Sequence, residues 1–186
     1  MEITLDLTQQ ATRKHLLDSL LDLMSTAQRE QYDSFSDSAG VPETHHHNIG
    51  EVNATIDALD VPEGVKADLR GVYDILAHAE AAVHEVPVEQ THFHEVGDSS
   101  GIRNALAICL AFYVLHASAV HATAVQPGSG KIEIAHGVMD VPAPATAAIF
   151  KAHDIPLMPE DQRPEGELCT PTSAAIIAHF VTAFDA

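Results

Sequence analysis

Cysteines, basic residues and long apolar runs are all scarce in this chain of 186 residues, which has two cysteines and nine lysines and arginines. Cys109 and Cys169 are too few for a disulfide framework. The longest apolar run, residues 105–114, is too short to span a bilayer, so we expect no membrane partner. Residues 1–6 show neither the basic nor the apolar part of a secretory signal, so we expect a cytoplasmic protein.

Acidic residues dominate the charge, because 27 aspartates and glutamates leave a formal net charge of −18 at pH 7. A surface this acidic repels phosphate backbones, which argues against nucleic acid and anionic membranes as partners, and it attracts cations. The 13 histidines outnumber the lysines and arginines together. Neutral imidazole is the commonest transition-metal ligand, so these histidines either bind metal or are scattered over an acidic surface. Whether the histidines are clustered in the sequence distinguishes metal binding from incidental scatter.

Apolar residues make up 46% of the chain, which is too much for intrinsic disorder and enough for a buried core. Segments with helical and strand periodicity follow one another without a repeat. We therefore expect a mixed α/β fold of helices and short strands, in one compact domain over residues 1–186. The expected elements are a strand at 3–7, a helix at 11–31, a loop at 32–44, a helix at 48–59, a helix opened by Asp60-Val61-Pro62, an extended segment at 91–97, a helix at 102–116, a hairpin of 120–126 with 131–135, a short helix after Pro144, a strand at 155–158 and a helix at 171–184.

The helix after Pro62 has the clearest pattern in the sequence. Apolar residues recur through 65–83 at alternating steps of four and three, which is typical of an amphipathic helix. The aspartate before it predicts a cap for the free amides at the helix start. His78 and His84 lie off the apolar stripe, four residues after Asp74 and Glu80. Solvated acid–histidine pairs explain both histidines.

His45, His46 and His47 form the densest histidine cluster. Three imidazoles on a loop can capture nickel, zinc or copper, with nickel and copper favoured by the general affinity order. A polar loop with incidental histidines explains the same run equally well. The cluster alone leaves both interpretations open.

A second cluster, His92-Phe93-His94-Glu95, carries more information because of its spacing. On a strand, residues two apart share a face, so His92 and His94 would project together while Phe93 points into the core. Glu95 joins them if the following residues begin a turn, and two histidines with a carboxylate can hold a divalent metal. His136 follows a predicted strand, where a turn could expose its imidazole. Hydrogen-bonded structural histidines remain the alternative for this cluster, and a turn histidine for His136.

Thr170 and Pro171 predict the start of the last helix, with Thr170 as its N-cap. Free backbone amides, the positive end of the helix dipole and the hydroxyls of Thr172 and Ser173 together form a generic anion cradle. Simple capping explains the same residues. Cys169 could be a soft metal ligand or a small residue at the helix entry.

Taken in order, several segments resemble the LarC family of nickel insertion proteins. The resemblance is clear over residues 45–186 and weak over 1–44, and His92-Phe-His-Glu-Val-Gly97 is its most specific motif. The other matching segments are the histidine run at 45–47, residues 76–84, Ala135-His-Gly-Val-Met-Asp-Val-Pro-Ala-Pro-Ala-Thr146 and Glu165-Gly-Glu-Leu-Cys-Thr-Pro-Thr-Ser-Ala-Ala175.

The resemblance implies a lyase-type nickel insertion into pyridinium-3,5-bisthiocarboxylic acid mononucleotide, the precursor of the nickel-pincer cofactor. It further implies that CTP hydrolysis, with Mg²⁺ or Mn²⁺, belongs to a separate C-terminal domain chain. In this chain it implies nickel ligands at His92, His94, Glu95 and His136, delivery by the histidine run at 45–47, and a phosphate site at Thr170, Thr172 and Ser173. A homo-oligomer remains open.

This chain also departs from the family pattern. Residues 9–15 stand where the family has a glycine-rich stretch ending in Gly-Asp-Met, and Ser100 and Asn104 stand where it has two aspartates. Lost carboxylates mean lost metal ligands or a lost general base. Catalytic activity is therefore left open, and the alternative is a non-catalytic relative that binds nickel, another divalent metal or a partner chain.

Overall fold

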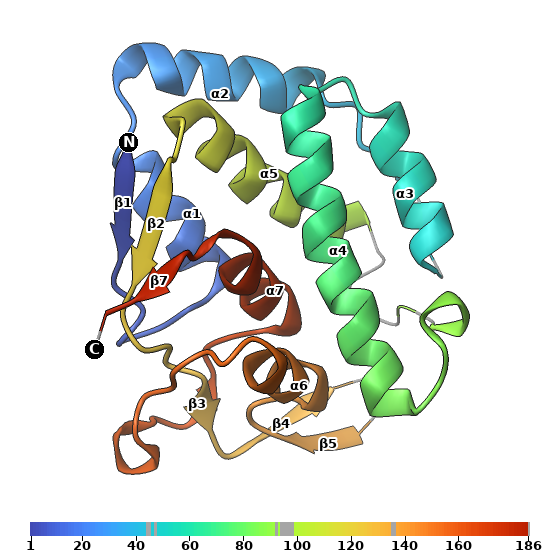
Figure 1. The fold of residues 1–186 in the computed structure, drawn as a ribbon, viewed down its shortest axis with the longest axis vertical. Helices are drawn as coiled ribbons and strands as arrows, with labels where there is room; N and C mark the ends of the chain where they lie inside the picture. Colours follow the sequence, from blue (N-terminus) through green and yellow to red (C-terminus); the bar gives the residue numbers. More distant parts are fainter. Residues whose placement is uncertain (44–45, 47, 92, 94–98, 135–136, 186) are drawn as a thin grey trace.

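A three-stranded parallel sheet lies at one side of the molecule, beside both chain termini (Figure 1). The computed structural model describes residues 1–43, 46, 48–91, 93, 99–134 and 137–185. The strand order is β1 (Glu2–Leu5), β2 (Ala119–Ala122) and β7 (Ala183–Phe184), with Ile3 opposite Val120. The alternation that predicted the first strand buries Ile3 and Leu5 and leaves their neighbours exposed.

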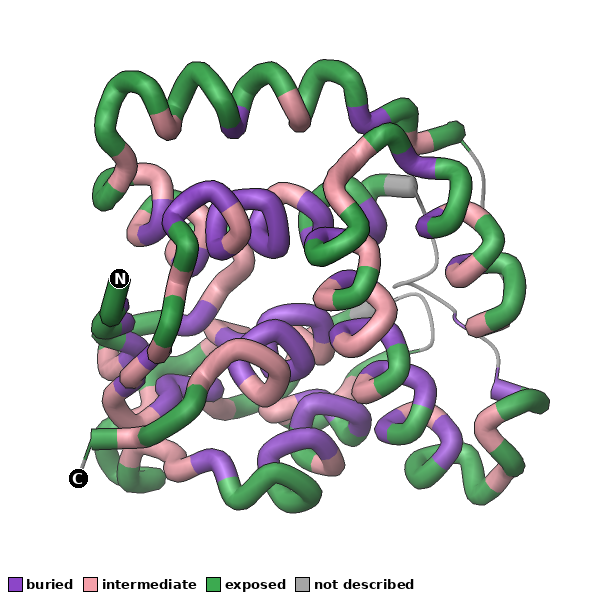
Figure 2. The backbone as a smooth tube through the Cα atoms, turned by 45° about the horizontal axis from the view of Figure 1, so that its top comes forward, coloured by how far each residue is buried: buried purple, intermediate pink, exposed green. Residues whose placement is uncertain are grey.

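The chain segment after β1 forms two helices where a single helix at 11–31 was expected. These are α1 (Arg13–Leu21) and α2 (Thr26–Ser38). The break arises at Ser25, whose hydroxyl accepts from the Gln28 amide while the Gln28 side chain accepts from the Ser25 amide. This capping box begins a new helix. The helix continues to Ser38, so the expected loop at 32–44 was wrong over residues 32–38. α2 is exposed over most of its length (Figure 2).

The central helix α4 (Glu63–His84) confirms the amphipathic pattern and packs against α3, α5, α6 and α7. Its apolar stripe is buried from Val65 to Ala79, whereas Val83 is 36% exposed. The expected aspartate cap was wrong, because the N-cap residue is Pro62. Within the described residues, no side chain forms a capping hydrogen bond at this helix start. The neighbouring helices are α3 (Ile49–Ala58), α5 (Ser99–Leu115), α6 (Pro144–Ala152) and α7 (Pro171–Phe180).

The expected hairpin of 120–126 with 131–135 was wrong, because its two strands pair with other partners. The first strand lies in the parallel sheet, and β4 (Lys131–Ile134) pairs with β5 (Gly137–Asp140). Between them, β3 (Gly128–Ser129) pairs with β6 (Gly166–Glu167). A Cβ at Gly128 would lie 1.8 Å from the carbonyl oxygen of Gly166, so this turn serves as a close backbone contact between distant segments.

Two further expectations differ at the level of elements, and a third is not tested. The strand at 155–158 is reduced to a single bridge between Val125 and Leu157. The last helix ends at Phe180, after which the chain forms β7. The extended segment at 91–97 lies largely outside the described residues. Two short 3₁₀ helices, η1 (Val88–Gln90) and η2 (Glu160–Gln162), complete the connections.

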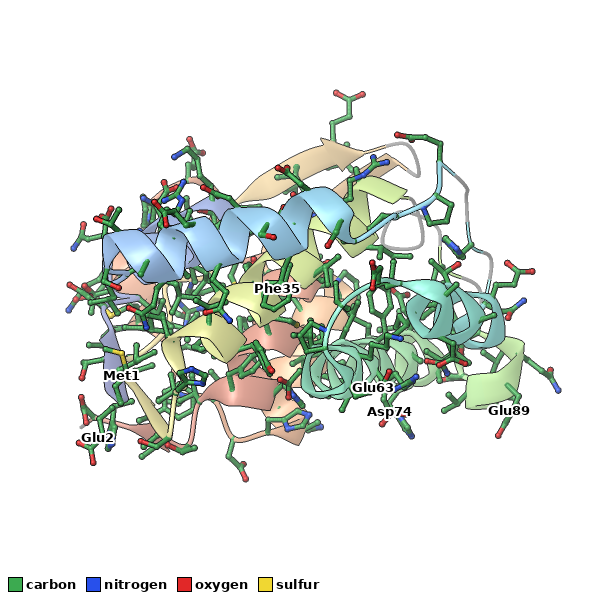
Figure 3. The ribbon with its side chains drawn as sticks, turned by 90° about the horizontal axis from the view of Figure 1, so that it is seen from above. Met1, Glu2, Phe35, Glu63, Asp74 and Glu89 are labelled. Atoms are coloured by element: carbon green, nitrogen blue, oxygen red, sulfur yellow. The ribbon has the colours of Figure 1, made fainter. Side chains whose placement is uncertain are left out.

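Within the described residues, no helix is both long enough and apolar enough to cross a membrane. Acidic side chains such as Glu2, Asp74 and Glu89 project outward from the ribbon (Figure 3).

Candidate functional site

His46 is the one predicted metal ligand that falls within the described residues; His45, His47, His92, His94, Glu95 and His136 lie outside them. His46 is 4% exposed, and its Nε2 lies 2.6 Å from the Thr55 hydroxyl. This contact attaches His46 to α3, which packs against α4.

Phe93, between His92 and His94, points into the core as its position in the motif predicted. It is 2% exposed and packs edge-on against Tyr73 of α4, with ring centroids 5.9 Å apart. Aromatic pairs of this geometry stabilise beyond the area that they bury. Phe93 is therefore anchored to the same central helix that α3 contacts.

A third contact joins the flanks of these two segments. Arg103, in the second turn of α5, donates to the Glu43 carboxylate at 2.5 Å and to the Val41 carbonyl at 3.3 Å. Glu43 lies just before the histidine run, and α5 begins just after the His92–Gly97 motif. The ion pair thus connects Glu43 with the second turn of α5.

Among the described residues, no group of three or more histidine, cysteine, aspartate or glutamate side chains could hold a metal ion. A nickel site formed by His92, His94, Glu95 and His136 would lie outside this part of the chain. The ligand set therefore stays a prediction.

The start of α7 has the geometry of a capped helix. The Thr170 hydroxyl accepts from the Ser173 amide at 3.3 Å and lies 3.2 Å from the Ser173 hydroxyl. Thr172 and Ser173 are both buried. Capping is thus present as predicted, and an anion here would have to compete with these internal contacts. The phosphate site at Thr170, Thr172 and Ser173 stays a prediction.

Cys169, beside this helix start, is a fully buried residue. Burial raises the pKa of its thiol far above the ordinary value, with the nearby Glu167 carboxylate adding to the effect. Full burial at the start of α7 suits a small residue packed at the helix entry. The structure favours the small helix-entry residue over the soft ligand.

The histidines on α4 behave as expected from their spacing. His78 lies 3.5 Å from the Asp74 carboxylate and His84 lies 3.5 Å from the Glu80 carboxylate. Both are surface pairs of the kind that residues four apart on a helix form. They account for two of the 13 histidines without a metal.

Comparison with known proteins decides the family. The model of the family described as "Nickel insertion protein" matches residues 5–186. The chain belongs to the nickel insertion protein family. It is 38% identical over 140 residues to the pyridinium-3,5-bisthiocarboxylic acid mononucleotide nickel insertion protein of Staphylococcus epidermidis. The aligned residues make up 75% of this chain and 34% of that relative. It is 40% identical over 141 residues to the protein of the same name from Staphylococcus saprophyticus, covering 75% and 35%.

The chain therefore spans about a third of the length of these curated relatives of the nickel insertion protein family. No solved structure matches it. The family match extends over nearly the whole chain.

In this member of the nickel insertion protein family, one polar cluster was not predicted from the sequence. At the carboxyl end of β1, the Asp6 carboxylate accepts from the amide and hydroxyl of Thr8, which lowers the pKa of Asp6. The His15 ring lies 2.9 Å from the Asp6 carbonyl oxygen, and the Thr123 hydroxyl accepts from the Leu7 amide.

The position of this cluster matters because ligands of parallel sheets bind at the carboxyl ends of the strands. An aspartate directly after an alternating segment was the available signal. It was missed because the parallel pairing of β1 with β2, 117 residues apart along the chain, was not foreseen.

Proposed function

We propose that this chain binds nickel as a substrate and takes part in its insertion into pyridinium-3,5-bisthiocarboxylic acid mononucleotide. The supporting observation is the family match over residues 5–186, together with relatives named for that insertion. We further propose that the CTP-dependent step, with Mg²⁺ or Mn²⁺, belongs to a separate C-terminal domain chain. The setting proposed for this pathway is the cytoplasm.

In this proposal His92, His94 and Glu95, with His136, are the nickel ligands. Two imidazoles and a carboxylate suit a divalent transition metal, and imidazole suits nickel in particular. The run His45–His47 receives the ion and hands it over. The anchoring of Phe93 and His46 to α4 and α3 supports a shared location for the two segments.

The net charge of the chain supports nickel capture. A net charge of −18 raises the local concentration of cations and so favours capture of Ni²⁺ from dilute solution. Histidine binds metal only as the neutral imidazole, so nickel affinity should fall as the solution is acidified. The hydroxyls at Thr170, Thr172 and Ser173 are proposed to contact the phosphate of the precursor.

The test is calorimetric titration of nickel into the wild type and the double variant His92→Ala/His94→Ala. We expect the double variant to bind nickel roughly 100-fold more weakly or worse, because loss of second-shell partners alone costs 10- to 100-fold. The matched control is His78→Ala/His84→Ala, which removes two surface histidines paired with acids on α4. Equal nickel affinity in the wild type and His92→Ala/His94→Ala would show that the proposed ligand set is wrong.

A further inference from the structure

An open cavity of about 500 Å³ lies where the ends of α5 and α7 meet the start of β2. Its wall includes Asp68 of α4, Tyr113 and His116 at the end of α5, and His179 and Phe180 at the end of α7. Cavities that bind small organic molecules are of this size. None of the described residues that line it belongs to the predicted nickel or phosphate sites, so the proposed function gives this cavity no role.

Asp68 gives the cavity a negative charge. Among the described residues, the lining contains this one carboxylate and neither lysine nor arginine. The Asp68 side chain is 35% exposed, and its Oδ1 accepts from Nε2 of His179 at 3.0 Å. Within the described part of the chain, its second oxygen forms no hydrogen bond, so this oxygen can accept one from a ligand.

The end of α7 adds to this preference for positive charge. The carboxyl end of a helix carries a partial negative charge, and both α5 and α7 end at the cavity. The end of α5 already holds a cation, because the α-ammonium of Met1 donates to the His116 carbonyl at 2.7 Å. The end of α7 lies next to Asp68 through the His179 contact, and these two groups together leave the cavity attractive to a second cation.

The histidines of the wall do not make this a metal site. Nε2 of His179 is bonded to Asp68, and its Nδ1 faces α4, where a Cβ added at Gly71 would lie 2.7 Å away. No group of three or more metal-binding side chains occurs among the described residues. An organic cation needs no such ligand set, since one carboxylate and an apolar wall are enough to bind it.

Aromatic rings supply that apolar wall. Phe180 stacks on Phe112, with ring centroids 4.1 Å apart, and remains half-buried. Tyr113 is also half-buried, and its ring centroid lies 6.2 Å from that of His116. Aromatic rings attract organic cations and at the same time cover their apolar parts.

We propose that this cavity binds a small organic cation, in which an ammonium group bonds Asp68 and an aromatic or alkyl body packs against Phe180 and Tyr113. The proposal goes beyond the proposed function and does not depend on it. The pyridinium precursor is a different kind of ligand, because Asp68 would repel its two thiocarboxylates.

The test is an NMR titration of the isotope-labelled protein with benzylamine, which is a protonated amine at pH 7. Salt at about 0.15 M screens the general attraction of an acidic surface for cations. We expect saturable shifts at amides of the cavity wall, such as those of Ser118 and Thr182. The expected Kd is roughly 1 mM, which is ordinary for a ligand of about eight non-hydrogen atoms.

Two further ligands test the role of charge on the wild type alone. Benzyl alcohol and benzoate keep the aromatic ring but are neutral and anionic, and both should bind at least about tenfold more weakly than benzylamine. Because this series needs no substitution, it tests the proposal whatever a variant does to the α4–α7 contact. Equal affinity for benzyl alcohol and benzylamine, or benzylamine shifts confined to amides outside the cavity, would overturn the proposal.

The variant Asp68→Asn removes the charge and keeps an oxygen that can accept from His179. It should weaken benzylamine binding at least about tenfold, because hydrogen bonds to a charged group are the strong ones. The matched control is Asp74→Asn, which removes the same charge from an exposed pair with His78 on the same helix and should leave the affinity unchanged. Equal losses in the two variants would show that the net charge of the chain, and not the cavity, attracts the cation.

Discussion

At the scale of single residues, the packing of α7 on α4 depends on the absence of one side chain. The His179 ring lies over Gly71, where an added Cβ would come within 2.4 Å of its Cε1 atom. The same ring lies 3.0 Å from the Asp68 carboxylate and packs edge-on against Phe180. Gly71 is therefore required by space, although glycine weakens a helix relative to alanine.

The substitution Gly71→Ala is expected to destabilise the protein by about 1–3 kcal/mol, because the imidazole must move and its contacts with α4 are strained. The control is Gly64→Ala in the same helix, where the added Cβ would lie 3.4 Å from the Tyr113 ring, an ordinary contact. That change should leave stability equal or raise it by about 0.5–1 kcal/mol. Urea unfolding measures both, and an unaltered midpoint for Gly71→Ala would contradict the steric account.

At the scale of elements, local sequence predicted the helices well and their boundaries less well. The apolar stripe over residues 65–83 correctly predicted α4. The same kind of pattern predicted a single helix at 11–31, where the structure has α1 and α2. The division at Ser25 depends on two reciprocal hydrogen bonds with Gln28, a signal in the sequence that apolar periodicity does not detect. Strand pairing was predicted worst, since the partner of β2 lies at the other end of the chain.

Replacing Ser25 by alanine removes the cap of α2 and should lower the unfolding free energy by about 1 kcal/mol. Ser34, an exposed residue in the middle of α2, gives the matched control, because Ser34→Ala should be neutral or slightly stabilising there. Thermal unfolding followed by circular dichroism distinguishes the two variants. Equal unfolding midpoints for Ser25→Ala and Ser34→Ala would mean that the cap does not stabilise α2.

At the scale of the whole molecule, charge is the dominant feature. Nine basic residues cannot neutralise 27 acidic ones, so the folded chain repels itself electrostatically. Salt screens this repulsion over the Debye length, which falls from about 30 Å at 0.01 M to about 8 Å at 0.15 M.

We therefore expect the thermal unfolding midpoint to rise when sodium chloride is added, by roughly a few degrees, with most of the gain below about 0.15 M. The concentration range identifies the cause, because effects of salt on apolar burial continue to grow at molar concentrations. Differential scanning calorimetry across 0.01–1 M salt measures the curve. A midpoint that falls over the low range would show that ion pairs outweigh the repulsion.

The sequence by itself determined the α/β class, the central amphipathic helix, the acid–histidine pairs at spacing four and the inward direction of Phe93. These features depend on neighbours within a turn or a strand, which periodicity describes directly. Only the tertiary structure decided the Arg103–Glu43 pair, 60 residues apart, and the Asp68–His179 pair, 111 residues apart. A periodic pattern says which face of an element is buried, and the packing of the whole chain decides what that face meets.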